Sequence, residues 1–156
     1  MNMAKVEPEA VLPWTSKARE TRMKRKLRFL PALIWMAVIF YMSHQTGSDL
    51  DTILPFFQQW IPAMHSFDFG HFILYFVLAV TLYGALLPAS ASWKGKALVV
   101  LLCLLYGVTD EFHQMFVPGR YPDVLDLRND TIGAALAMLT VSVPGVKRIV
   151  QRSFSG

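Results

Sequence analysis

Residues 97–120 read ALVVLLCLLYGVTDEFHQMFVPGR, an apolar run that leads directly into acids and ends at proline and glycine. The strictly apolar part, 97–108, has 12 residues, which is too few to cross a hydrocarbon core of about 30 Å. A spanning helix must therefore continue through Asp110 and Glu111 and stop near Pro118. At 1.5 Å per residue, Asp110 then lies roughly 20 Å along the helix, inside the hydrocarbon level. Charged side chains at that depth are costly, normally face the protein interior and usually serve a function.

The composition indicates that the rest of the chain also lies in a bilayer. Of 156 residues, 54% are hydrophobic and 17% are charged, whereas about a quarter of a soluble domain is charged. Further apolar runs at 27–43, 69–87 and 131–146 predict an all-α, polytopic bundle of about four short transmembrane helices. The segment 48–66, broken by prolines, fits an aromatic-rich segment in the interface or a cap over the bundle. No A-x-A cleavage site follows the first run, so we interpret it as a retained helix.

Basic residues give the expected orientation. Thirteen of the 15 lysines and arginines lie in the two termini and in the loop between the second and third runs. The positive-inside rule therefore predicts a multi-pass protein of the bacterial cytoplasmic (inner) membrane with both termini cytoplasmic. We expect a basic tail at 1–26 near anionic headgroups, a membrane domain at 27–146 and a second basic tail at 147–156. Topology alone explains the net charge of +4, so no nucleic-acid partner is expected.

On this map the polar residues gather at the outer end of the bundle. All four histidines and eight of the 11 acids fall at or beyond the outer ends of helices. Helical spacing places several of them on shared faces: Asp68 with His71 and Tyr75, Asp110 and Glu111 with Gln114, and Asp126 with Asp130. We expect these faces to meet in one hollow open to the outside. The alternative is a structural polar clamp between short helices. The pattern Gly133-x-x-x-Ala137 predicts close helix packing.

The third helix ends in Pro118-Gly119-Arg120. Proline stops the helix, glycine permits a turn, and the arginine is expected to point back at the acids or out at a ligand. A guanidinium binds phosphate or carboxylate through paired hydrogen bonds. Neutralising Asp110 or Glu111 and binding an anion remain equally open for Arg120.

Four motifs in order resemble the VanZ-like membrane protein family over about residues 40–139. They are Ser43-His44-Gln45, Asp68-Phe69-Gly70-His71-Phe72-x-x-Tyr75, Asp110-Glu111-x-x-Gln114-x-Phe116-x-Pro118-Gly119-Arg120 and Asp126-x-x-x-Asp130-Thr131-x-Gly133. Asp130 stands where the family usually has asparagine, and Gly70 where many members have lysine. The resemblance implies low-level resistance to the lipoglycopeptide teicoplanin, and it does not name a reaction.

Two functions stay open at this point. As an envelope enzyme, the protein would act by acid–base hydrolysis or group transfer on a membrane lipid or a lipid-linked glycan substrate. The acid–base groups would be Asp68, His71, Asp110 and Glu111, and the substrate-binding residues Arg120, Gln114, Tyr75, Asp126, Asp130, Ser43 and Gln45. The alternative is a non-enzymatic protein that binds a lipid or shields the cell from an antibiotic. A small transporter is the third choice, because four short helices make a poor pathway without oligomerisation.

The spacing of the possible ligand residues does not favour a metal, and the sequence does not identify a cofactor. Oxygen and nitrogen ligands for a divalent metal could come from Asp68, His71, Glu111 and His113. Glu111 and His113, however, are two positions apart and point apart on a regular helix. Cys103 lies within an apolar run and has no second cysteine to pair with. A homo-oligomer is compatible with the sequence, and no protein partner is predicted.

Overall fold

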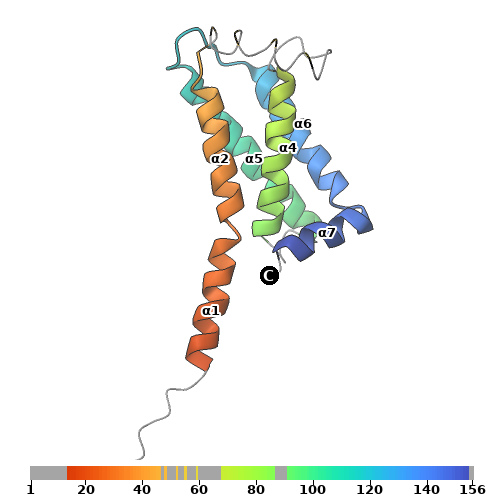
Figure 1. The fold of residues 1–156 in the computed structure, drawn as a ribbon. Coiled ribbons are helices and arrows are strands. Elements are labelled where there is room, and N and C mark those ends of the chain that lie inside the picture. The colour runs from red at the N-terminus through yellow and green to blue at the C-terminus, as the bar shows by residue number, and fades with distance from the viewer. Residues whose placement is uncertain are drawn as a thin grey trace, which may run out of the picture.

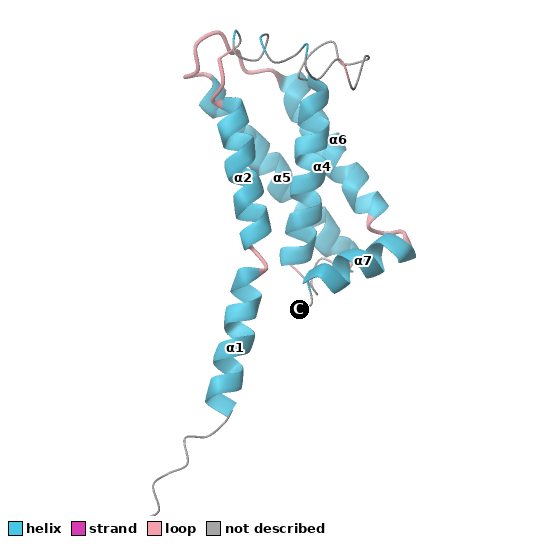
Figure 2. Ribbon diagram, viewed as in Figure 1, coloured by secondary structure: helices cyan, strands magenta, loops and turns pink. Residues whose placement is uncertain are grey.

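The computed structural model describes residues 14–46, 68–86 and 91–154, and residues 48, 52, 55 and 59 singly. Within these parts every regular element is a helix, which confirms the all-α prediction (Figure 2). The helices are α1 (Trp14–Leu27), α2 (Leu30–Ser43), α4 (Asp68–Ala85), α5 (Trp93–Gln114), α6 (Val124–Thr140) and α7 (Pro144–Phe154). Figure 1 shows α2, α4, α5 and α6 running lengthwise through the molecule, with α1 extending below α2 and α7 turned across the lower end.

Helix α5 runs through the acids, as the length argument predicted. It begins at Trp93, four residues before the predicted start, because Ser92 caps it by accepting the backbone N–H of Gly95 at 3.0 Å. The hydroxyl cap replaces a hydrogen bond that the first helical turn otherwise lacks. The helix ends at Gln114, and Gly119 then adopts a φ of 75°, the left-handed conformation that glycine favours.

Helix α6 differs from the prediction at both ends. The predicted span was 131–146, but α6 begins at Val124 because Asp123 caps it, accepting the backbone N–H of Leu125 at 2.7 Å. It ends at Thr140, and Pro144 begins α7, in the first turn that proline prefers. Helices α6 and α7 meet at a bend of 98°. The segment predicted as a basic tail from 147 is therefore mostly helical.

The predicted bounds of the first two spans agree more closely with the helices in the structure. Helix α4 matches the predicted 69–87 within two residues. Pro31 lies in the first turn of α2, where its missing N–H does no harm. The basic segment before it is helical from Trp14 onward. The predicted interfacial segment 48–66 lies almost entirely outside the described residues.

One helical stretch, Arg19–Ser43, which runs from within α1 to the end of α2, has the length and composition to cross a membrane. Helices α6 and α7 together pass the same test as a bent pair. Helix α4 is also apolar, but its described apolar part, Gly70–Ala85, is slightly too short to count as a candidate span. The described residues are therefore all-helical, with one clear candidate span.

The core lies between α4 and α6, which approach closely at Gly133. A Cβ atom at this position would lie 2.5 Å from the carbonyl oxygen of Phe72, so only glycine fits. Ala137, one turn further along, is fully buried, which confirms the close packing expected from the Gly133-x-x-x-Ala137 pattern. Two hydrogen bonds tie α2 to its neighbours: Trp35 Nε1 donates to the Leu74 carbonyl at 2.8 Å, and the Tyr106 hydroxyl donates to the Met36 carbonyl at 2.7 Å.

Candidate functional site

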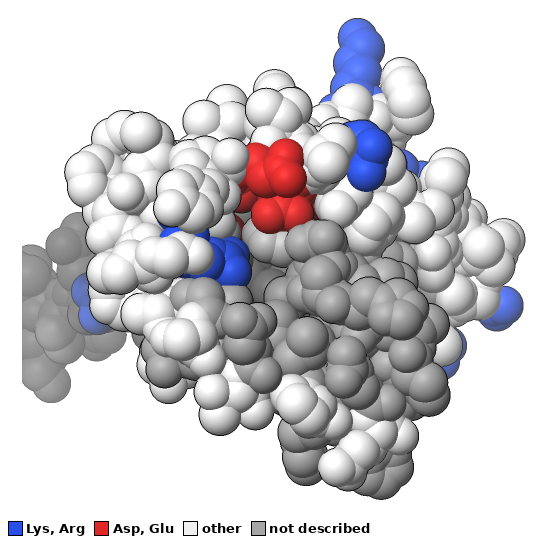
Figure 3. Space-filling model, turned by 90° about the horizontal axis from the view of Figure 1, so that it is seen from above, with Lys and Arg blue, Asp and Glu red and all other residues white. Residues whose placement is uncertain are grey.

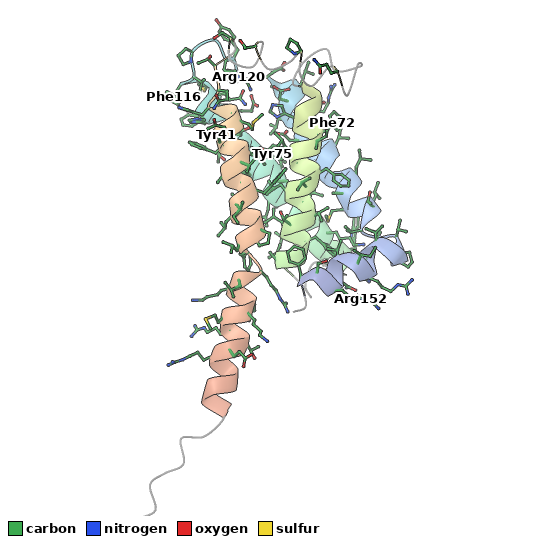
Figure 4. The ribbon with its side chains drawn as sticks, in the orientation of Figure 1. Tyr41, Phe72, Tyr75, Phe116, Arg120 and Arg152 are labelled. Carbon is green, nitrogen blue, oxygen red and sulfur yellow. The ribbon has the colours of Figure 1, made fainter. Side chains whose placement is uncertain are left out.

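The buried polar side chains gather at one end of the bundle, where α2 and α5 finish and α4 and α6 begin. We call these residues the polar cluster: Ser43, His71, Asp110, Glu111, Gln114, Asn129 and Asp130. Viewed onto this end, Figure 3 shows acidic side chains at the centre of the face, with basic side chains to either side. Figure 4 places Arg120 at this end, Tyr75 deeper between the helices and Arg152 at the opposite end. The predicted convergence of polar faces from separate helices is therefore present.

His71 joins α4 to two acids of α6. Its Nδ1 lies 2.9 Å from Oδ1 of Asp130, and its Nε2 lies 3.7 Å from Oδ2 of Asp126. An ionised carboxylate only accepts hydrogen bonds, so Nδ1 carries the hydrogen in this pair. In the neutral ring, Nε2 then presents its lone pair toward Asp126. The ring also stacks on Tyr75, with centroids 6.4 Å apart.

Asp110 joins α5 to the end of α2. The Ser43 hydroxyl donates a hydrogen bond to its Oδ2 at 2.9 Å, and both side chains are buried. This contact connects the last residue of α2 to α5 inside the cluster.

Only one of the two carboxylate oxygens of Glu111 has a hydrogen-bond partner among the described residues. Its Oε2 accepts the backbone N–H of Asp123 at 2.7 Å, whereas its Oε1 is buried and has no hydrogen-bond partner among the described residues. The same holds for both amide atoms of Gln114, for the Tyr75 hydroxyl and for Oδ2 of Asp130. A buried polar atom left without a partner costs about 1–3 kcal/mol. Buried polar atoms of this kind need a water molecule, an ion or a polar ligand as a partner.

Arg120 lies beside the polar cluster, at the same end of the bundle. The turn at Gly119 directs the chain back, and the backbone N–H of Arg120 bonds to the Val117 carbonyl at 3.1 Å. The side chain is half-buried and forms no ion pair with any acid that the structure describes. Anion binding by its guanidinium therefore stays a prediction.

Six of the eleven predicted site residues belong to the polar cluster, Tyr75, Arg120 and Asp126 lie beside it, and two remain, Gln45 and Asp68. The side-chain amide of Gln45 donates to the Tyr41 carbonyl at 3.0 Å and so serves the end of its own helix. Asp68 begins α4, and its side chain lies outside the described residues.

His113, considered above as a metal ligand with Glu111, faces elsewhere. Its Nε2 lies 3.3 Å from Nδ1 of His44, and its ring packs on Phe40. The described ligand atoms that do converge belong to His71, Glu111 and Asp126, one atom from each, all within 4.8 Å of one another. Spacing along one helix could not reveal this set, because it draws on three helices.

Sequence reasoning also missed Gly107, which makes room for the cluster. A Cβ atom there would lie 2.8 Å from Oδ2 of Asp130. Its position three residues before Asp110, on the same helical face, was the available signal. Asn129, buried next to Asp130, was missed as well.

Comparison with known proteins gives one match. The sequence profile of the family described as VanZ/LLP1 matches residues 29–145, most of the chain. No curated protein and no solved structure matches the sequence.

Proposed function

Because the chain belongs to the VanZ/LLP1 family, we propose that it is a multi-pass membrane protein acting on envelope lipids. In this proposal the polar cluster opens to the extracytoplasmic side of the cytoplasmic membrane. It binds the anionic headgroup of a lipid or lipid-linked glycan and acts on it by acid–base hydrolysis or group transfer. The observation that carries the proposal is the set of buried, unpartnered polar atoms that three helices bring together beside Arg120.

The distribution of side chains supports a bilayer as the surrounding solvent. Large apolar residues are exposed along the outer faces of the helices, including Leu33, Ile34, Leu101, Leu105 and Leu136, while acids and an imidazole are buried. Water-soluble proteins have the reverse arrangement. Only 17% of the apolar window in Arg19–Ser43 is buried, unlike a core helix of a soluble protein.

Helix lengths agree with four crossings. At 1.5 Å per residue, α4, α5 and α6 extend about 27, 33 and 26 Å, close to the hydrocarbon thickness of about 30 Å. The stretch Arg19–Ser43, formed by α2 and part of α1, has 25 residues and extends about 38 Å, which is more than enough to cross. Helix α7 has a basic face with Lys147, Arg148 and Arg152, which suits a helix lying at the headgroups.

Charge supports the orientation. The basic residues of α1, the start of α5 and α7 lie at the end opposite the polar cluster, and Arg120 and Arg128 are the basic residues near the cluster itself. The positive-inside rule then assigns the cluster to the outside.

The cluster has the groups that hydrolysis or group transfer needs. Arg120 would hold a phosphate or carboxylate of the headgroup through its paired donors. Asp110, Glu111 and His71 would take a proton from the attacking group and return one to the leaving oxygen. Asp130 would keep His71 in the required orientation through its hydrogen bond at 2.9 Å.

The test uses purified protein in nanodiscs, incubated with lipid-linked wall precursors and, separately, with teicoplanin, with products sought by mass spectrometry. We expect a wild-type product that Asp110→Asn and Glu111→Gln each reduce by about 100-fold or more. Arg120→Gln is compared with its matched control, Arg152→Gln, which removes the same charge at the opposite end of the bundle. Turnover that Asp110→Asn, Glu111→Gln and Arg120→Gln all leave intact would refute the proposal. A substrate that co-purifies unchanged would instead show a binding or shielding protein.

A further inference from the structure

The polar cluster and the neighbouring Asp126 provide a set of ligand atoms that the acid–base proposal alone does not explain. We infer that His71, Glu111 and Asp126 bind one divalent transition-metal ion. One ligand atom from each residue lies within 4.8 Å of the other two, and the three residues come from α4, α5 and α6. The inference rests on the proposed function, since the ion would bind the same anionic headgroup at the same site. With His71 and Glu111 holding the ion, Asp110 is the acid that remains for proton transfer.

The orientation of His71 is the first argument. Asp130 accepts the hydrogen of Nδ1 at 2.9 Å, which leaves Nε2 as the free ligand atom. Metal-binding histidines almost always donate their other ring N–H to a carboxylate, carbonyl or water in this way, which fixes the tautomer and raises ligand basicity. Asp130 is fully buried, so this partner of the imidazole is shielded from water.

The separation of His71 and Asp126 is the second argument. Nε2 lies 3.7 Å from Oδ2 of Asp126, beyond the length of a normal hydrogen bond. Two ligands on bonds of about 2.1 Å to one tetrahedral ion lie about 3.4 Å apart. The observed separation is therefore closer to that of two ligands sharing an ion than to that of a direct contact.

Glu111 provides the third argument, independently of the other two. Its Oε2 is fixed by the backbone N–H of Asp123 at 2.7 Å. Its Oε1 has no partner among the described residues, although Glu111 is only 8% exposed. A buried carboxylate oxygen that lacks a donor is stabilised by a cation. The Glu111 carboxylate is thus fixed by one backbone contact and has a second oxygen that lacks a donor.

The chemistry of the ligands selects the ion. One imidazole nitrogen and two carboxylate oxygens suit Zn²⁺ or Mn²⁺. Mg²⁺ and Ca²⁺ prefer oxygen ligands throughout. With Asp110 and Asp130 also buried nearby, four carboxylates lie close together, and a double positive charge offsets their repulsion.

The experiment measures bound metal rather than activity. Detergent-purified protein is stripped with chelator and loaded with Zn²⁺ or Mn²⁺, and bound metal is measured by mass spectrometry and affinity by titration calorimetry. We expect one ion per chain, lost in His71→Gln and weakened at least tenfold in Glu111→Gln and Asp126→Asn. Asp130 acts through His71, so Asp130→Asn should weaken binding by about 10–100-fold without abolishing it. The ion should raise the Tm of the wild type and of no variant that has lost it.

The matched control is His113→Ala. His113 and His44 form a second imidazole pair at the same end, with nitrogens 3.3 Å apart, and His113→Ala should keep the ion. Loss of the ion in this variant, or full binding in Glu111→Gln and Asp126→Asn variants whose folding is confirmed by circular dichroism, would overturn the inference. Lipid turnover that survives chelator yet is lost in Asp110→Asn would overturn the metal site and leave the proposed function standing. Stoichiometric metal without turnover would support the site and count against the proposed function.

Discussion

Nδ1 of His71 and Oδ1 of Asp130 lie 2.9 Å apart, and this pair links α4 to α6 across the buried end of the bundle. Asp130 is completely buried and His71 nearly so, so neither can exchange its partner for water. The pair therefore contributes both to the packing of the two helices and to the orientation of the imidazole. These two contributions can be separated by substitution.

Asp130→Ala should lower the free energy of unfolding by about 1–3 kcal/mol, because it leaves the His71 N–H buried without an acceptor. Asp130→Asn should cost clearly less, because the amide oxygen still accepts that hydrogen. Asparagine is also the residue that the resemblance leads one to expect at this position. Chemical denaturation in detergent, followed by circular dichroism, compares the two. Equal losses would mean that the hydrogen bond contributes nothing to stability.

Ser43 and Asp110 should be coupled in a double-mutant cycle. The Ser43 hydroxyl donates to Oδ2 of Asp110 at 2.9 Å within the buried cluster, so each alanine substitution removes the same bond. We expect Ser43→Ala and Asp110→Ala to be non-additive by about 0.5–3 kcal/mol in the free energy of unfolding, the range for residues in direct contact. Strict additivity would show that the two side chains do not interact in the folded protein.

Gly133→Ala should loosen the contact between α4 and α6. The new Cβ would lie 2.5 Å from the Phe72 carbonyl oxygen, a backbone atom that cannot move without its helix. We expect a loss of about 1–3 kcal/mol in the free energy of unfolding, as in other overpacked cores. Gly145→Ala is the control, because no atom lies within 4 Å of a Cβ there. Thermal unfolding should show no loss of stability for this variant, since alanine favours helix. Similar melting temperatures for both variants would contradict the close approach at Gly133.

The sequence predicted the course of α5 well because a physical constraint acted on it. An apolar run of 12 residues cannot cross a bilayer, so the helix had to include Asp110 and Glu111. The start of α6 was placed too late because the prediction followed the apolar run 131–146 and did not use Asp123 as a helix cap. Aspartate is a common capping residue, but the residues after Asp123 are largely polar, so the first turns of α6 did not look like part of a membrane helix.

The members of the cluster were predictable from the sequence, but their partners were not. Helical spacing groups residues within one helix, so it placed His71 with Tyr75 and Asp126 with Asp130. Which side chains meet across helices depends on packing and rotation. For that reason the pairing of His71 with Asp130, and of His113 with His44, appears only in the structure.

Cysteine labelling tests whether the cluster faces outward. Cys103 is the single native cysteine and is fully buried, so a Cys103→Ala background gives low labelling. Tyr121→Cys lies next to Arg120 at a position that is 84% exposed, and Ser153→Cys lies on α7 at the opposite end. With a membrane-impermeant maleimide on intact spheroplasts, we expect residue 121 to react at once and residue 153 only after the membrane is permeabilised, because basic segments stay cytoplasmic. The reverse pattern would place the polar cluster in the cytoplasm, and equal labelling of both before permeabilisation would show that the two ends are not separated by a membrane.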